Sequence, residues 1–246
     1  MGQIITITSG KGGTGKTTTA AALSSCLAVL GKRTLCIDFD AELRNLDLAL
    51  AMSNYAVMDF VDIASGRHKI KESCSESPQI PNLFFLTAPA AKIPDNIGVE
   101  EISMMFKNIR AEFDYCIIDA PAGVGRGFRL ANADVDMSII VTTGDLSAMR
   151  NATRTADVLR GMGVKKLRLI VNKVNRKKFR KIRTTIDDII DITGVRLIAV
   201  VVEDMNIQMA LHSGTPLVLY RNRKAAYEFL DAARRLIGED LPLKKL

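Results

Sequence analysis

The chain has no tryptophan, two histidines and four cysteines in 246 residues, and aromatic residues make up only 5% of it. Closely spaced Cys and His pairs are the usual ligands of structural zinc and of iron–sulfur clusters. Here His68 and His212 are isolated, and no C-x-x-C pair occurs among Cys26, Cys36, Cys74 and Cys116. The sequence therefore gives no support to a disulfide framework, a cluster or a metal site made of these residues.

Long apolar runs are also missing, since none approaches the roughly 20 residues that span a bilayer. The chain enters a strand-like segment, Ile4–Thr8, almost at once, which leaves no room for a secretory signal. A charged fraction of 25% and a hydrophobic fraction of 48% are typical of a folded globular protein. We therefore expect a single domain, residues 1–246, that works in the cytoplasm.

Positive charge is in excess, with 34 Lys and Arg against 27 Asp and Glu and a formal net charge of +7. Such a balance favours an anionic partner, which includes nucleotides, nucleic acids and acidic lipids. Composition does not choose among the three.

The most informative stretch is a glycine-rich loop between an apolar segment and an Ala-rich one, Ser9-Gly10-Lys11-Gly12-Gly13-Thr14-Gly15-Lys16-Thr17-Thr18. It fits G-x-x-x-x-G-K-[ST], in which backbone N–H groups and a helix N-terminus hold a phosphate chain. In this pattern Lys16 reaches the β- and γ-phosphates and the Thr17 hydroxyl ligates Mg²⁺. The loop therefore predicts a nucleoside triphosphate site built from residues 10–18.

A second lysine, Lys11, follows the first glycine of the loop, and Lys-Gly-Gly-Thr-Gly-Lys-Thr-Thr resembles the deviant phosphate loop of the MinD/ParA class of ATPases. The resemblance covers essentially the whole chain. It implies ATP and Mg²⁺ as cofactors and an ATP-dependent homodimer in which Lys11 crosses to the partner's nucleotide. A charge in that place would also stabilise the transferring phosphoryl group, as arginine fingers do.

Two apolar segments, residues 34–37 and 115–118, end in carboxylates, which places Asp38, Asp40 and Asp119 at the ligand-binding edge of a parallel sheet. We expect Asp38 and Asp119 to support Mg²⁺ together with Thr17. The segment 38–48 is most similar to the MinD branch of the class, with its Leu-Arg-Asn-Leu-Asp, and this similarity implies that Asp40 orients the attacking water.

The resemblance also implies contacts to the adenine ring from Asn172 and from the segment Val202-Glu203-Asp204, where Val202 replaces the proline of the family. A further departure follows Asp119. The family pattern Asp-x-Pro-Ala-Gly-x-Glu leads to a glutamate, whereas this chain has Gly125-Arg126-Gly127 there. This departure leaves open whether the loop switches, or contacts a partner, as the loop of the family does.

Strand-like and helix-like segments alternate through the chain, which predicts an α/β fold with a doubly wound, mostly parallel sheet flanked by helices. The expected helices are residues 16–30, 57–64, 99–113, 147–161, 206–212 and 223–237. Ser147 is expected to be the N-cap of the helix 147–161. Met104 is expected to lie in the core, and residues 67–81 are expected to form a surface excursion. The basic run 175–183 is expected to open a helix that continues to Asp187, Asp188 and Asp191, which opposes the helix dipole and suggests either an anionic contact or a solvated face.

These features favour a MinD-like ATPase that dimerises on ATP and controls the division site or a similar intracellular position through a protein partner, such as a division inhibitor. A ParA-type partition ATPase that binds DNA non-specifically is the rival, and a flagellar-number regulator of the same class is a closer one. Nucleic acid is not favoured. Because only four residues follow Pro242, we expect weak or no autonomous membrane binding, although a peripheral position at the inner face of the membrane stays open.

Overall fold

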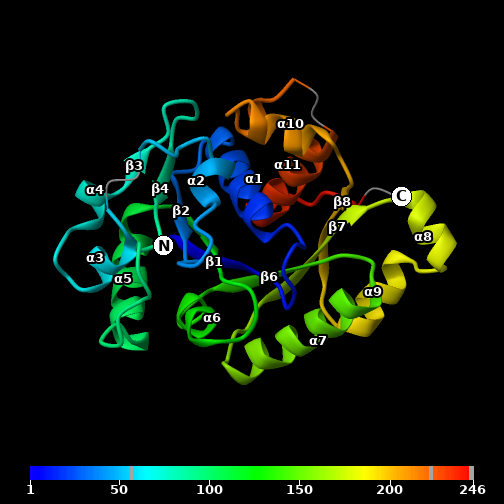
Figure 1. Ribbon diagram of the computed structural model, residues 1–246, viewed down its shortest axis with the longest axis horizontal. Helices are drawn as coiled ribbons and strands as arrows, with labels where there is room; N and C mark the ends of the chain where they lie inside the picture. The colour runs from blue at the N-terminus through cyan, green and yellow to red at the C-terminus, as the bar shows by residue number, and fades with distance from the viewer. Residues whose placement is uncertain (56–57, 222–223, 244–246) are drawn as a thin grey trace.

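The computed structural model describes residues 1–55, 58–221 and 224–243, and its centre is one eight-stranded sheet of order β3-β4-β2-β5-β1-β6-β7-β8 (Figure 1). All pairings are parallel except that of β3 with β4. The strands are β1 (Gln3–Thr8), β2 (Thr34–Asp38), β3 (Ser75–Glu76), β4 (Leu83–Leu86), β5 (Tyr115–Asp119), β6 (Met137–Thr142), β7 (Leu167–Val174) and β8 (Leu197–Val202). The predicted doubly wound, mostly parallel sheet is confirmed.

Helices cover both faces of this sheet. They are α1 (Lys16–Val29), α2 (Leu46–Ala49), α3 (Phe60–Ala64), α4 (Ile70–Ser73), α5 (Val99–Glu112), α6 (Arg126–Ala131), α7 (Leu146–Gly161), α8 (Arg176–Ile182), α9 (Ile186–Thr193), α10 (Asn206–His212) and α11 (Lys224–Leu236), with a 3₁₀ turn η1 (Leu217–Leu219). Side chains of α1 and α11 pack on one face, and those of α3, α5, α7 and α9 on the other.

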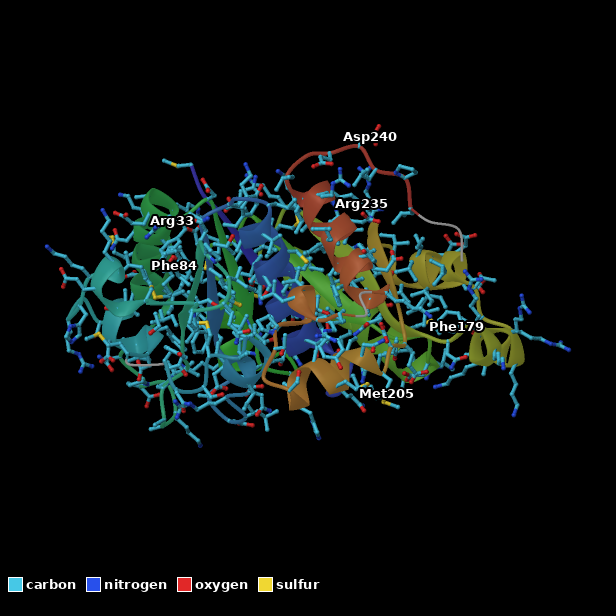
Figure 2. All side chains as sticks on the ribbon, turned by 90° about the horizontal axis from the view of Figure 1, so that it is seen from above. Arg33, Phe84, Phe179, Met205, Arg235 and Asp240 are labelled. Atoms are coloured by element: carbon cyan, nitrogen blue, oxygen red, sulfur yellow. The ribbon has the colours of Figure 1, made fainter. Side chains whose placement is uncertain are left out.

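The central strands β2, β5 and β6 are buried along their whole length, which explains why the sequence shows them as continuous apolar runs rather than as alternating patterns. Neighbouring side chains serve opposite faces: Ile4 belongs to the α5 side, and Ile5 belongs to the α1 side. At the β4 end of the sheet the Arg33 guanidinium lies 4.3 Å above the Phe84 ring (Figure 2).

Several local expectations were wrong. Residues 67–81 are not only a surface excursion, since they form α4 and β3 and bury Ile70 and Ile80. Met104 is 59% exposed because it falls on the outer side of α5, whereas Met105 is buried. The helix α6 was not expected. Positions 57 and 223, where two expected helices began, and the tail beyond 243 lie outside the described residues.

The basic run does not open one long helix. Arg183 takes a left-handed conformation (φ 52°) and ends α8, and Thr185 caps a separate helix, α9. Asp187 and Asp188 therefore lie in the first turn of α9, and Arg180 lies in the last turn of α8, where the helix dipole favours each charge. The opposition between charge and dipole is limited to the first turn of α8.

No helix in the described ranges is both long and apolar enough to cross a bilayer.

Candidate active site

The glycine loop between β1 and α1 forms a concave backbone cradle. Gly13 (φ 77°) and Gly15 (φ 94°) adopt left-handed conformations, which other residues adopt only at a cost in strain. Helix α1 has no side-chain cap at Gly15, so its first N–H groups stay available to an anion. Lys16 follows as a buried residue at the start of this helix. Loop and helix together have the form that a phosphate chain requires.

Two consecutive residues of β7 hold the loop from behind. The Asn172 Nδ2 atom donates to the Thr14 carbonyl at 2.8 Å, and the Lys173 Nζ atom donates to the Gly13 carbonyl at 2.8 Å. A Cβ on Gly15 would lie 2.3 Å from Asn172 Nδ2, so the contact requires glycine at that position. The buried Asn172 Oδ1 atom has no hydrogen-bond partner among the described residues. Asn172 therefore supports the loop, and its adenine contact stays a prediction.

Lys173 was not among the predicted site residues. It lies at an irregularity in the pairing of β7 with β8 and has a φ of 55°, which is uncommon for a lysine. A bulge of this kind redirects a side chain, here toward the phosphate loop. The pattern of the sequence carries no signal for such an irregularity.

The two expected magnesium carboxylates, Asp38 and Asp119, are opposite one another in the β2–β5 pairing and are almost fully buried. Asp38 Oδ1 accepts from the Asp40 amide at 2.8 Å, and Asp38 Oδ2 accepts from the Leu46 amide at 3.3 Å. Asp119 Oδ1 is buried without a partner among the described residues. Asp119 is thus the carboxylate with free capacity for a ligand.

Burial raises the pKa of both carboxyls. That of Asp119 rises to about 7, mainly through desolvation, although a hydrogen bond from the Thr17 hydroxyl lowers it and the charge of Asp38 raises it. The pKa of Asp38 rises to about 6, again mainly through desolvation, although the backbone hydrogen bonds from Asp40 and Leu46 lower it. A cation placed here would favour the ionised forms.

These residues fit a magnesium ion. Mg²⁺ prefers oxygen ligands, retains several waters and is held by one or two carboxylates together with substrate phosphates. Thr17 and Asp119 are brought together beside the loop, with Lys16 close enough to affect the same carboxyl. No cluster of three or more His, Cys, Asp or Glu side chains suited to a metal occurs in the described ranges, so the ion needs nucleotide oxygens and water to complete its coordination.

Asp40 begins the loop after β2, and its half-exposed side chain is partly engaged by that loop. Its Oδ1 atom accepts from the amides of Glu42 and Leu43, both at 3.2 Å. Oδ2 has no hydrogen bond to a described residue in the structure. One oxygen therefore fixes the turn, which leaves the other for the water that Asp40 is predicted to orient.

Lys11 is at the outer rim of the loop and is held within its own subunit. Its Nζ atom lies 3.0 Å from Asp145 Oδ1 and 2.8 Å from Ser147 Oγ. Asp145, not Ser147 as expected, is the N-cap of α7, since its carboxylate accepts from the Ala148 amide. The hydrogen bond from the Thr143 hydroxyl, followed by those from Ser147 and Lys11, holds the pKa of Asp145 well below its usual value.

Beside Lys11 a pocket of about 270 Å³ separates the phosphate loop from α8. Its walls include Lys173, Lys178 and Glu203. Phe179, labelled in Figure 2, also lines it. The Phe179 ring packs on Gly144, where a Cβ would lie 2.4 Å from the ring. The pocket thus joins the phosphate loop to one of the residues expected at the adenine.

The other two residues of the expected adenine segment do not line this pocket. Val202 is the last residue of β8 and is half-buried. The Asp204 carboxylate accepts from the amides of Asn206 at 3.0 Å and Ala225 at 3.1 Å, and so ties α10 to α11. Burial raises the pKa of Asp204, but the hydrogen bonds from Asn206 and Ala225, together with the charge of Lys224, outweigh burial and lower the pKa. The adenine contacts of Val202, Glu203 and Asp204 stay predictions.

The sequence profile of the CobQ/CobB/MinD/ParA nucleotide-binding domain matches residues 5–217. The chain belongs to the MinD/ParA family. Over its whole length it is 37% identical to the septum site-determining protein MinD of Bacillus subtilis, of which the match covers 93%. It is 38% identical to the MinD of Synechocystis, with 98% of this chain and 92% of that protein covered.

Solved structures agree with this MinD/ParA assignment. MinD in the MinC:MinD cell division complex of Aquifex aeolicus superposes with a TM-score of 0.91 at 33% identity, covering 99% of this chain and 98% of that chain. MinD of Pyrococcus horikoshii complexed with Mg-ADP superposes with a TM-score of 0.85 at 28% identity, with 97% of each chain covered. This member of the family is therefore a MinD-like ATPase, and its cofactors are ATP and Mg²⁺.

Proposed function

We propose that the chain is an ATP-dependent switch that dimerises on ATP, is reset by hydrolysis and thereby controls placement of the division site. Its relatives over the full length are septum site-determining proteins. The observation that carries the proposal is the position of Lys11, at the rim of the phosphate loop with 44% of its side chain exposed. A lysine in that place is accessible to a nucleotide presented by a second copy.

In the proposed reaction, Lys16 holds the phosphate chain at the start of α1, and Lys11 adds a second positive charge from the opposite subunit. These charges stabilise the transferring phosphoryl group. Asp40 aligns the attacking water through its uncommitted oxygen. Asp119 and Thr17 would hold Mg²⁺, and the ion would supply positive charge against the phosphate oxygens. Asp38 fixes the loop that carries Asp40 by accepting a hydrogen bond from the Asp40 amide.

We further propose a protein partner, either a division inhibitor or a positioning factor. Support comes from the Aquifex relative, whose structure was determined as a MinC:MinD complex. The same proposal places the protein in the cytoplasm, with any peripheral position at the inner face of the membrane depending on partners rather than on strong binding of its own.

A sedimentation experiment tests this proposal. The full chain is mixed with vesicles containing anionic lipid, or with DNA, in Mg²⁺ with ATP or ADP, and hydrolysis is measured in parallel. We expect hydrolysis together with little sedimentation in either mixture. Strong ATP-dependent sedimentation with vesicles would contradict the expected weak membrane binding.

The DNA-binding rival keeps one specific observation in its favour. Six cations lie between positions 176 and 183, namely Arg176, Lys177, Lys178, Arg180, Lys181 and Arg183, and none forms an ion pair with a described residue. If these residues bind DNA phosphates, affinity must fall steeply with salt, because each contact releases a counterion. A flat salt dependence, or no binding, identifies them as a solvated face.

A further inference from the structure

Gly125 stands where the family pattern has a glutamate, and the next residue, Arg126, bridges two loops. Its guanidinium donates to the carbonyls of Ile93 at 2.7 Å, Pro94 at 2.8 Å and Ile97 at 2.8 Å. A longer contact reaches the Asp95 carbonyl at 3.5 Å. One side chain thus supplies donors to almost every carbonyl of the segment 93–97.

Arg126 is also joined to the magnesium site by a short, compact stretch of chain. Residues 120–125 lead from Asp119 to the start of α6, and Gly123 takes a left-handed conformation (φ 87°) within them. Gly127 packs on Pro121 so closely that a Cβ would lie 2.9 Å from the ring. A displacement of this loop therefore carries Arg126 with it.

The two segments that Arg126 connects are anchored in different parts of the core. Ile97 is buried in the cluster beneath α5, whereas Phe128 is buried in the cluster beneath α7. Between them a groove of about 710 Å³ is bounded by residues 39–43, 92–95 and 121–128. Two of these three walls meet at the Arg126 guanidinium, and the third contains Asp40.

We propose that Arg126 is a positioning residue that makes residues 93–97 follow the loop 120–125, so that the groove changes shape with the nucleotide state. The inference rests on the proposed ATP switch, which supplies the movement of that loop. The surface formed by residues 93–97 thereby responds to the exchange of ATP for ADP.

The experiment is hydrogen–deuterium exchange on the full chain in Mg²⁺ with ADP or a non-hydrolysable ATP analogue. In the wild type we expect amides of both 120–125 and 93–98 to exchange differently in the two nucleotide states. In Arg126→Gln the response at 93–98 disappears, while that at 120–125 persists. Arg126→Lys restores part of it, because an ammonium keeps the charge but lacks the guanidinium fork.

Arg129→Gln is the matched control, since Arg129 is exposed on the same helix and its side chain forms no hydrogen bond or ion pair with a described residue. It should respond as the wild type does. A wild type in which only 120–125 responds overturns the inference, and so does an Arg126→Gln variant that matches Arg129→Gln. Failure of ATP-dependent dimerisation, measured on the same samples, is the separate result that removes the proposed switch. Comparing the wild type with ADP and with the ATP analogue still tests whether residues 93–98 respond together with 120–125, even if Arg126→Gln folds poorly.

Discussion

Lys11 Nζ lies 3.0 Å from Asp145 Oδ1 of its own subunit. The lysine that is expected to reach a partner's nucleotide therefore forms an ion pair within its own subunit. Both side chains are about two-fifths exposed, at 44% and 40%. Exposed pairs of this kind contribute only about 0.2–1 kcal/mol. The ion pair is therefore weak enough for a bound triphosphate to replace, and it accounts for the resting position of Lys11.

Asp145→Asn should strengthen ATP-dependent dimerisation by about two- to thirtyfold, because each subunit no longer gives up its Lys11 ion pair on assembly. Asparagine preserves the N-cap of α7, so the fold is spared. The dimer dissociation constant in a non-hydrolysable ATP analogue is the measurement, with Asp157→Asn on the same helix as control. Weaker dimerisation would show that Asp145 itself contributes to the interface.

Asp40→Ala should keep ATP-dependent dimers and reduce hydrolysis by about a hundredfold or more, the range expected for loss of a positioned base. Asp40→Asn separates the two roles of the side chain. Its amide oxygen can still accept from Glu42 and Leu43, so the turn is retained while the carboxylate is lost. Hydrolysis restored by asparagine would mean that Asp40 serves only the turn; Glu42→Gln is the control.

The raised pKa values of Asp119 and Asp38, about 7 and about 6, predict a pH dependence of stability. In the nucleotide-free protein these carboxyls hold protons that the unfolded chain releases near pH 4. Their contribution to stability is complete below that pH and is lost as pH rises to about 7, at up to about 1.4 kcal/mol per pH unit for each proton.

Thermal unfolding between pH 5 and pH 8, without nucleotide, tests this dependence. Asp119→Asn should flatten the decline, because its amide does not titrate. Mg²⁺ with nucleotide should also reduce the decline, since the bound cation favours the ionised carboxylates. A variant with the same slope as the wild type would show that Asp119 is ionised throughout this range.

Asn172→Ala should weaken nucleotide binding by removing the hydrogen bond to the Thr14 carbonyl, with a cost of about 1–3 kcal/mol for a buried group left unpaired. Comparing adenine with guanine nucleotides separates support of the loop from base recognition. Equal losses indicate support alone, whereas a selective loss of ATP affinity indicates an adenine contact. Asn108→Ala, at an exposed position of α5, is the control.

The sheet and most of the site were predictable because their causes are local in sequence. Buried parallel strands are continuous apolar runs, and the residues that follow them must meet at one edge, which brings Asp38, Asp119 and the glycine loop together. The cluster of Thr17 with Asp119 follows from this rule and from the spacing of the phosphate loop.

What was missed depends on backbone conformations and contacts that a pattern does not reveal. The break between α8 and α9 occurs at Arg183, where a left-handed residue would ordinarily be glycine. Lys173 reaches the loop only through an irregular strand pairing. The N-cap of α7 was predicted two residues too late, at Ser147, because the prediction gave Asp145 no role, although aspartate is among the favoured caps. Arg126 was noted as a departure, but its acceptors are about thirty residues away in sequence.

Sedimentation velocity in Mg²⁺, with ADP and with a non-hydrolysable ATP analogue at saturating concentrations, tests the central claim most directly. The account predicts monomers with ADP, dimers with the analogue, and Lys11→Ala monomeric in both while still binding ADP. Lys165→Ala, an exposed lysine away from the loop, should behave as the wild type does. A wild type that stays monomeric with the analogue, or a Lys11→Ala variant that dimerises normally, would contradict it.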